Sequence, residues 1–294
     1  MADTVITEIG TTGASDTSRS GAGRPVHRPA RRRVPVGTVV AVLVLAVVLA
    51  WAIAPALFTT ANPLVGDGAV SRQAPSSAHP FGTDVLGRDL FARVVHGTRA
   101  SLQATAIAIA VAFVASTVIG LVSGFVGGWL DEVLMRIVDI MLAVPSLLVS
   151  LLLVTALGFG TTNVAIAVGV GSVAAFSRVL RAEVLRVRTA AYVEAAEGGG
   201  ARWWDVLLRH VLPHAITPIL ALVALEFGTA ILAIASLNFL GYGSEPPAPD
   251  WGGLVADGRN QLATAWWITT LPGLVIVAVV VAANQLSRAI GARR

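Results

Sequence analysis

The chain has 294 residues, 55% hydrophobic and only 13% charged, with a formal net charge of +4. Soluble domains carry about 25% charged residues, so this composition excludes an ordinary soluble domain and indicates several membrane spans. The chain contains no cysteine, which excludes disulfides and thiolate chemistry, and no lysine, which excludes an ATP site of the P-loop kind because that site needs a lysine on the phosphates.

The first 34 residues are rich in Thr, Ser, Gly, Pro and Arg. They end in a basic cluster made of Arg28, Arg31, Arg32 and Arg33. This composition predicts a disordered tail. The apolar run that follows, residues 35–58, is long enough to cross a bilayer, and no cleavage site is evident. We therefore expect an uncleaved first transmembrane helix.

Five further apolar segments follow, at about residues 102–125, 136–157, 163–180, 215–237 and 267–290. Each offers roughly the twenty apolar residues needed to cross about 30 Å of hydrocarbon. The predicted fold is therefore all-α, a polytopic membrane protein with six transmembrane helices. Arginines concentrate in the segments that share a side with the N-terminus, and this bias predicts that both termini are cytoplasmic. Residues 59–100 then form an external loop, residues 101–290 a five-helix core, and residues 291–294 a cytoplasmic tail.

The external loop contains the sequence HPFGTDVLGRDL. Thr83 or Asp84 could cap a helix whose apolar positions share one face, and this predicts an interfacial helix within the loop. Asp84, Arg88 and Asp89 have two readings. They either contact an external partner or form ion pairs with one another.

The second and third spans are joined by a glycine-rich turn that Asp131 follows, and Asp131 could cap the next helix. Arg136 and Asp139 are three residues apart, which favours a structural ion pair on one helical face. Pro145 is expected to kink or open the third span. The fourth span is rich in Gly, Ala and Ser, which indicates a close interface with another helix or subunit.

The polar stretch AYVEAAEGGGARWWDVLLRHVLP, residues 191–213, lies within a predicted cytoplasmic loop, residues 185–213. It predicts a short helix up to Glu197, a corner at three successive glycines, and a second amphipathic helix, because each glycine costs a helix interior about 1 kcal/mol relative to alanine. Such a shape can dock into a groove on a partner, or it can be an ordinary interhelical loop. The candidate contact residues are Glu194, Ala195, Ala196, Gly200, Ala201, Leu212 and Pro213.

His210 and His214 are four residues apart, a spacing that can place two imidazoles on one metal ion. No glutamate accompanies them as in a zinc hydrolase, and Pro213 lies between them. We expect no metal site and no catalytic residues.

Glu226 stands near the middle of the fifth span, with no basic residue nearby in sequence. An intramembrane carboxylate is costly and normally faces a cavity or a partner. Glu226 is therefore a candidate for the translocation path or a subunit interface, together with Asn238. The alternative is a protonated, hydrogen-bonded residue of the core.

The predicted external loop at residues 238–266 contains FLGYGSEPPAPDWG. Its prolines and glycines predict a rigid, non-helical turn. Pro246, Pro247 and Trp251 are candidates for contact with an external protein. Alternatively, the tryptophans of this loop serve as anchors at the membrane interface.

Four motifs stand in a recognisable order. They are HPFGTDVLGRDLFARVVHGTRASL at residues 79–102, GGWLDEVLMRIVDIMLAVP at 127–145, the EAA run with its following Gly and Leu-Pro at 194–213, and FLGYGSEPPAPDWG at 239–252. Together they resemble the C-type permease subunit of dipeptide, oligopeptide and nickel ABC importers. The family commonly has a glutamate where this chain has Ile234, and a serine where it has Asn238.

The resemblance implies a type I ABC-importer permease core with cytoplasmic coupling helices in the bacterial plasma membrane. The chain would be a non-catalytic subunit without a cofactor, since ATP and Mg would bind in partner chains. The implied partners are a homologous B-type permease subunit, two cytoplasmic ATPase domains, an extracytoplasmic binding protein, a peptide substrate and membrane lipid, with no nucleic acid. Nickel or another small solute is an alternative substrate, and an ion-coupled secondary transporter is an alternative function.

Overall fold

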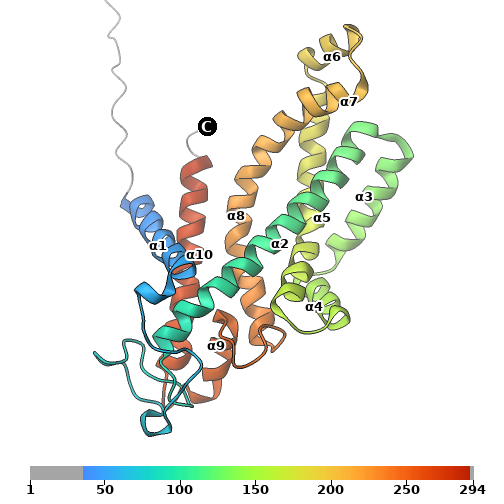
Figure 1. Ribbon diagram of the computed structural model, residues 1–294. Helices are drawn as coiled ribbons and strands as arrows, with labels where there is room; N and C mark the ends of the chain where they lie inside the picture. Colours follow the sequence, from blue (N-terminus) through green and yellow to red (C-terminus); the bar gives the residue numbers. More distant parts are fainter. Residues whose placement is uncertain (1–35, 292–294) are drawn as a thin grey trace, which may run out of the picture. The chain divides into compact units, whose positions relative to one another are not determined.

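The computed structural model describes residues 36–291, apart from the side chains at 217–221, 224, 290 and 291, and it is all-helical in this range (Figure 1). The helices are α1 (Val36–Ile53), η1 (Pro55–Leu57), η2 (Gly68–Val70), α2 (Leu90–Val126), α3 (Gly128–Ala143), α4 (Ser146–Leu157), α5 (Thr161–Arg188), α6 (Ala191–Gly198), α7 (Trp203–Asp205), η3 (Val206–Val211), α8 (Leu212–Phe239), α9 (Trp251–Gly258), η4 (Arg259–Gln261) and α10 (Trp267–Gly291). The predicted tails at 1–34 and 291–294 lie outside the described residues, except that Gly291 ends α10.

The long apolar helices coincide with the predicted spans. Among the described residues, α1, α2, α5 and α10 are each long and apolar enough to cross a membrane, and α3 with α4 forms a fifth, bent candidate. α8 has 28 residues and overlaps the remaining predicted span, but among the described residues only its part Leu225–Phe239 is apolar, and that part is shorter than a span. α2 has 37 residues, so at 1.5 Å per residue it is about 55 Å long and extends well beyond the roughly 30 Å of hydrocarbon.

The third predicted span consists of two helices, α3 and α4, which meet at an angle of 96°. Pro145 causes the break, because its ring removes a hydrogen-bond donor and disfavours helical backbone at the residue before it. Val144 is accordingly extended, with φ −103° and ψ 133°, and Pro145 directly precedes the first turn of α4. The prediction that Pro145 opens this span is confirmed.

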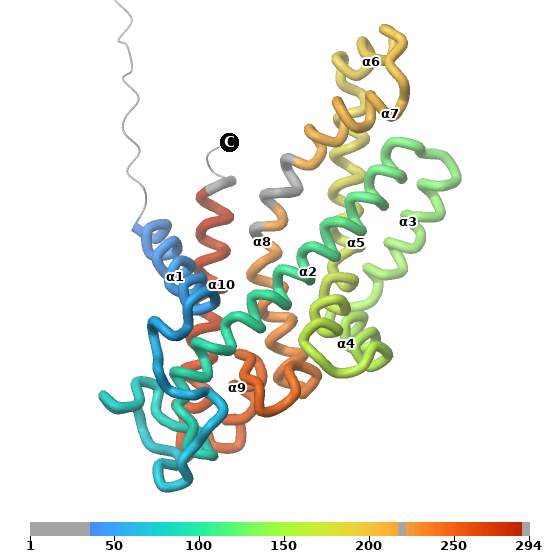
Figure 2. The backbone as a smooth tube through the Cα atoms, in the orientation of Figure 1, coloured from blue at the N-terminus to red at the C-terminus, as the bar shows by residue number. Residues whose placement is uncertain are grey.

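α2 and α5 pack closely along each other (Figures 1 and 2). The contact depends on glycine at two places. A Cβ added to Gly169 would lie 2.6 Å from the carbonyl oxygen of Ala108, and one added to Gly120 would lie 2.8 Å from the Cβ of Leu180. Neither position can hold a larger residue unless its neighbour moves. The small residues of the fourth span therefore form an interhelical interface, as predicted.

Loops and helix ends gather at one end of the described chain, which we call the cap (residues 54–97 and 240–268; Figure 1). Its core includes Leu90, Val94, Trp251, Leu254 and Ile268, all of which are buried. A sheet is absent from this part of the chain beyond a single bridge. Apolar side chains and polar contacts therefore hold its loops in place.

The predicted interfacial helix within residues 59–100 is wrong in its start and in its extent. The helix begins at Leu90, where the carboxylate of Asp89 accepts a hydrogen bond of 2.7 Å from the backbone N–H of Ala92. It then continues as α2 without a break. Thr83 and Asp84 do not cap it, because the chain reverses at Gly87, which has a φ of +73°. A Cβ at Gly87 would lie 1.8 Å from the carbonyl oxygen of Asp67.

We expect Gly169→Ala to lower the thermal stability of the purified protein by the equivalent of about 1–3 kcal/mol, because overpacking forces the backbones of α2 and α5 apart. The matched control is Gly273→Ala in α10, where an added Cβ meets nothing within 4 Å. This control should be neutral or slightly stabilising. Melting curves in the same detergent measure both. Equal melting temperatures for the two variants would contradict the close approach of α2 and α5.

Candidate functional site

The polar stretch around the EAA run folds as a helix, a turn and a second helix, which we call the corner (residues 189–211). It lies at the end of the described chain away from the cap (Figure 1). α6 supplies the EAA residues. Glu194 and Ala195 are exposed on α6, and Ala196 is half-buried. The predicted order of helix, glycine corner and helix is confirmed.

Gly200 is the glycine that the turn requires. Its φ is +82°, which L-residues with a side chain rarely adopt. Its N–H donates to the carbonyl of Glu197, and the N–H of Ala201 donates to the carbonyl of Ala196. These two bonds form a Schellman motif that closes the end of α6. Gly200 and Ala201 are therefore presented to solvent at a fixed angle, and both are exposed.

The second arm of the corner widens into a π-helix before it enters α8. After α7, residues 206–211 form η3, and the N–H of Leu212 donates to the carbonyl of Leu207, five residues back. Pro213 follows directly, and a proline inside a helix removes one N–H and crowds the carbonyl four residues before it. A widened turn relieves that crowding, and π-turns of this kind are frequent at functional sites. Leu212 is half-buried and Pro213 is exposed.

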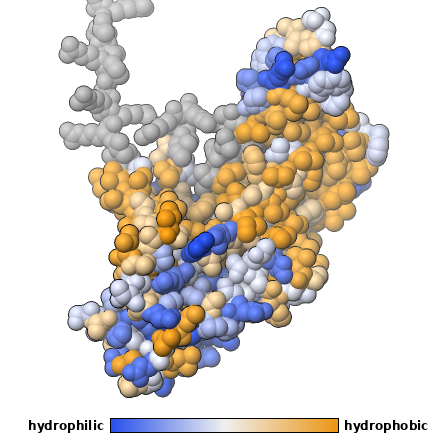
Figure 3. All heavy atoms as spheres, viewed as in Figure 1, coloured by the Kyte–Doolittle hydropathy of each residue, from blue (hydrophilic) through white to orange (hydrophobic). Residues whose placement is uncertain are grey.

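The corner is anchored to the rest of the chain by valines. Val193 of α6 and Val206 and Val211 of η3 are fully buried, and they pack in one cluster with Val187 of α5. The inner side of the corner is thus continuous with the core. Its outer side carries the charged residues, and Figure 3 shows hydrophilic surface at this end above a broad hydrophobic band.

Sequence reasoning missed two aromatic residues on the corner. Trp203 and Trp204 are both exposed and contact each other edge to face, with ring centroids 5.5 Å apart. Exposed aromatic pairs are typical of contact surfaces. The signal was present in the sequence, as a Trp-Trp pair within an otherwise polar loop.

A second set of contacts ties the base of the corner to the turn between α2 and α3. Arg181 of α5 donates two hydrogen bonds of 2.6 Å to the two carboxylate oxygens of Asp131, and Ser123 of α2 donates a third. Arg188, at the end of α5, donates to the carbonyl of Phe125. Three helices are therefore locked together where α5 meets the corner.

The expected ion pair between Arg136 and Asp139 is wrong. Asp139 pairs instead with Arg178 of α5. Asp131 does not cap α3 either, since the residue before that helix is Gly127, which makes no side-chain cap. Neighbouring positions on one helix are only weakly attracted. Here α5, which packs against α3, supplies an arginine to each carboxylate.

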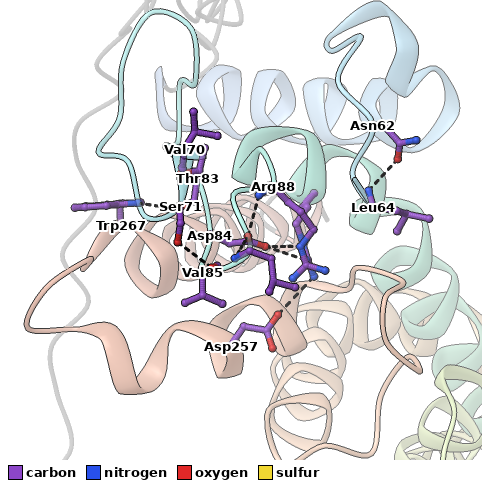
Figure 4. Close-up of polar contacts among 12 residues, drawn as sticks. Asn62, Leu64, Val70, Ser71, Thr83, Asp84, Val85, Arg88, Asp257 and Trp267 are labelled. Carbon is purple, nitrogen blue, oxygen red and sulfur yellow. Dashed lines mark hydrogen bonds and ion pairs between the residues drawn. The ribbon is translucent and has the colours of Figure 1, made fainter. Parts of the chain in front are cut away.

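At the cap, Asp84 is the centre of a buried charge cluster (Figure 4). Its Oδ2 accepts from the Nε of Arg88 at 2.6 Å and from the Nη1 of Arg93 at 3.0 Å. Its Oδ1 accepts from the backbone N–H groups of Leu86 and Arg88. Asp89, besides capping α2, lies 2.8 Å from the Nδ1 of His79. Asp84, Arg88 and Asp89 are all buried. Asp84 and Arg88 pair with each other, whereas Asp89 pairs with His79. Contact of these residues with an external partner stays a prediction.

Two further candidates are also buried. Trp251 is 1% exposed, and its indole N–H donates to the carbonyl of Val94. Asn238 donates 2.8 Å to Asp250, which also accepts from the N–H of Gly253 and caps α9. The structure thus gives both residues contacts within the chain, and their predicted roles, Trp251 toward an external protein and Asn238 at a path or interface, stay predictions. Both residues hold α9 against α2 and α8.

Pro246 and Pro247 remain exposed at the rim of the cap, as the prediction requires. They lie in the loop that joins α8 to α9. Trp266 is exposed, whereas Trp267 is buried and donates from its indole N–H to the carbonyl of Thr83.

Glu226 lies on α8 and its Oε1 accepts a hydrogen bond of 2.9 Å from the hydroxyl of Ser172 on α5. It is half-buried, and its neighbours Leu225 and Thr229 are exposed. The carboxylate therefore stands at the seam between α5 and α8, at the edge of an exposed face. This placement is compatible with each of its two readings, so its role stays a prediction.

The two histidines of the corner do not converge. The Nδ1–H of His214 donates to the backbone carbonyl of His210 at 2.7 Å, and its ring lies 5.2 Å from that of Tyr192. Within the described residues, three side chains suited to a metal ion do not come together anywhere.

Comparison with known proteins gives a consistent result. The family described as "Binding-protein-dependent transport system inner membrane component" matches residues 116–294. The chain is 37% identical to the dipeptide transport system permease protein DppC of Alkalihalophilus pseudofirmus, over 73% of this chain and 70% of that protein. It is 36% identical to the glutathione transport system permease protein GsiD of Pectobacterium atrosepticum, over 73% of this chain and 71% of that protein.

Solved structures share the fold. The chain aligns with the MetNI methionine ABC transporter in an inward-facing conformation, with a TM-score of 0.54, 19% identity, and coverage of 67% of this chain and 96% of that one. An amino acid ABC transporter with bound histidines aligns with a TM-score of 0.53 at 17% identity, over 69% of this chain and 94% of that one. At such low identity the likeness concerns the fold alone.

We expect Asp131→Ala to destabilise the protein by about 1–3 kcal/mol, because it removes three hydrogen bonds and leaves the partly buried guanidinium of Arg181 without its carboxylate. The matched control is Asp139→Ala, which removes an ion pair whose two side chains are both more than half exposed. Such a pair contributes at most about 1 kcal/mol. Thermal unfolding in one detergent compares the two variants. A larger loss for Asp139→Ala would contradict this assignment.

Proposed function

The chain belongs to the family of binding-protein-dependent transport system inner membrane components, and on that premise we propose that it imports peptides and receives the motion of an ATPase through its corner. As a member of this family it is the multi-pass membrane permease of an ABC importer. It is a non-catalytic component, and the family lacks catalytic cofactors. Its importer includes ATPase and binding-protein partners.

The observation that carries the proposal is the geometry of the corner. α6 and η3 turn about Gly200 and expose Glu194 and Ala195, while Val193 is fully buried beneath them. A polar outer surface can bind a partner protein, and a rigidly packed inner side can transmit a displacement of that surface to the neighbouring helices. We infer that Glu194 makes the polar contact with an ATPase. Ala195, Ala196 and Ala201 keep that contact close, and Gly200 sets its angle.

The substrate class is inferred from the relatives. Their names give dipeptides for one and glutathione, itself a small peptide, for the other. Identity of 36–37% over about 70% of their length supports a shared substrate class. We therefore propose a peptide for this chain. Nickel or another small solute is the alternative within the same family.

The orientation follows from the arginines. The corner and its flanks carry six arginines, Arg178, Arg181, Arg186, Arg188, Arg202 and Arg209, whereas the cap carries four, Arg72, Arg88, Arg93 and Arg259. The positive-inside rule then favours a cytoplasmic corner, cytoplasmic termini and an outward-facing cap. Pro246 and Pro247 would face the binding protein from the rim of that cap.

We further propose a second, homologous permease as the partner in the membrane, with one ATPase domain beneath each permease. α3, α4 and α8 expose many large apolar side chains, among them Ile140, Leu152 and Leu232. Lipid and a second permease would share these faces. Glu226 lies beside the exposed face of α8, which makes the seam between α5 and α8 the proposed side of the path.

In the proposed mechanism, closure of the ATPase pair moves the two corners together. The valine cluster carries the displacement of α6 and η3 into α5 and α8. The bonds between Arg181 and Asp131 carry it into α2 and α3. Helices tied in this way move as a body, and the path then changes from inward- to outward-facing.

The proposal is tested by co-purification of the ATPase subunits with this permease from membranes. Wild type should recover the ATPase, and Glu194→Arg or Gly200→Asp should reduce recovery about tenfold, since the loss of about 1.4 kcal/mol of contact energy has that effect. Glu132→Arg is the matched control, because it reverses an exposed charge at the start of α3, outside the corner.

Two outcomes decide the matter. Normal recovery by the control, with loss by both corner variants, supports the corner as the ATPase contact. If wild type recovers no ATPase and still imports peptide, the proposed coupling is wrong, and Glu226 becomes the residue to examine for ion coupling.

A further inference from the structure

The cap contains a cavity of about 530 Å³ that the proposed function does not use. Its walls come from the segment that precedes α2, from the loop between α8 and α9, and from α9 itself. The lining includes Leu86, Arg88, Arg93, Pro246, Pro247 and Asp257. The exposed prolines thus form its rim, while Arg88 and Arg93, which are buried, form its inner part.

Two of the nearby carboxylates are engaged by several donors each. Asp84 accepts four hydrogen bonds, from two backbone N–H groups and from both arginines (Figure 4). Asp250 accepts three, from Asn238, from the N–H of Gly253 and from the N–H of Ser244, and it is 3% exposed.

Asp257 is different. Its side chain is 48% exposed, and its contact among the described residues is with the Nη2 of Arg93, at 3.5 Å. That distance is at the outer limit for a hydrogen bond, and Arg93 is already committed to Asp84. A carboxylate has about four acceptor positions, so Asp257 keeps most of its capacity free. Asp257 is thus the exposed carboxylate among the residues that line the cavity.

The charges around the cavity do not balance. Three carboxylates, Asp84, Asp250 and Asp257, face the two guanidiniums of Arg88 and Arg93, which leaves one negative charge unmatched. Burial raises the pKa of the Asp257 carboxyl above its ordinary value; Arg88 opposes this, and the charges of Asp84 and Asp250 add to it. The main cause is therefore the partial removal of Asp257 from water, and the two neighbouring carboxylates add a smaller effect in the same direction.

The exposed carboxylate of Asp257 is the group on this cavity that an occupant can reach. An occupant that suits it carries a positive charge. A lysine or arginine side chain on a polypeptide loop brings that charge.

We propose that the extracytoplasmic binding protein inserts a lysine or arginine from a surface loop into this cavity, where it pairs with Asp257. This inference rests on the proposed function, which places the cap outside and a binding protein upon it. The binding protein is the occupant rather than the transported peptide, because the cavity opens at the proline rim and not at the seam between α5 and α8. Pro246 and Pro247 keep the mouth of the cavity rigid.

The experiment uses the complete importer in lipid nanodiscs and the binding protein of the same importer, with affinity measured by biolayer interferometry. Asp257→Asn should weaken binding about tenfold and reduce its dependence on salt, since it removes one charge at constant shape. Glu245→Gln is the matched control, because Glu245 is an exposed carboxylate on the same rim that does not line the cavity. It should change the affinity less than twofold.

Asp257→Lys should abolish binding, and a reciprocal change of one basic residue of the binding protein to glutamate should restore it. Recovery of ATPase with both variants, measured as above, shows that the complex is intact. If wild type binds the binding protein and Asp257→Asn binds equally well, this inference is overturned while the proposed function stands. If wild type binds no binding protein, both are overturned. If Asp257→Asn instead weakens binding of free dipeptide, the occupant is the substrate and the inference fails.

Discussion

The buried cluster around Asp84 fixes the position at which α2 begins, and the rest of the structure depends on α2. Moving a carboxylate and two guanidiniums out of water costs several kcal/mol per ion, and only good geometry with complete hydrogen bonding repays it. Asp84 meets that condition through four donors, two of them backbone N–H groups. A loop arrangement that left these buried charges without hydrogen-bond partners would have a higher free energy, so such arrangements are unfavourable. The cluster thus selects one path for the chain between α1 and α2.

From that start, α2 extends from the cap to the turn before α3, which lies near the base of the corner. Its close packing on α5 prevents sliding, because Gly169 and Gly120 bring backbone and side chains into direct contact. Near the C-terminal end of α2, Ser123 and Arg181 both donate hydrogen bonds to the carboxylate of Asp131. Under the proposed function, motion passes from the corner to the cap through stiff members of this kind. The break at Pro145 and the turn at Gly200 set the angles between them.

The sequence revealed those features that depend on neighbours along the chain. Apolar runs predicted the spans, Pro145 predicted a break, and three glycines predicted a corner. Features that depend on packing between distant segments were missed. The partner of Asp139 is Arg178 on α5 rather than Arg136 on its own helix, since spacing within one helix cannot reveal which helix packs beside it.

The burial of Trp251 and Asn238 also depends on packing between segments that are distant in the sequence, so their motif did not predict it. Nothing in the motif FLGYGSEPPAPDWG shows that the loop folds back against the start of α2. The sequence analysis did not select Asp257, because a single carboxylate within a predicted loop gives no periodic pattern.

Glu226 is the opposite case. Its sequence position alone marked it as unusual, and one hydroxyl, that of Ser172, is the donor the structure supplies to its carboxylate. A carboxylate with one neutral donor is poorly satisfied against hydrocarbon. This favours the proposed role of Glu226 at a path or subunit interface, whereas a protonated carboxyl held by Ser172 would satisfy the alternative reading.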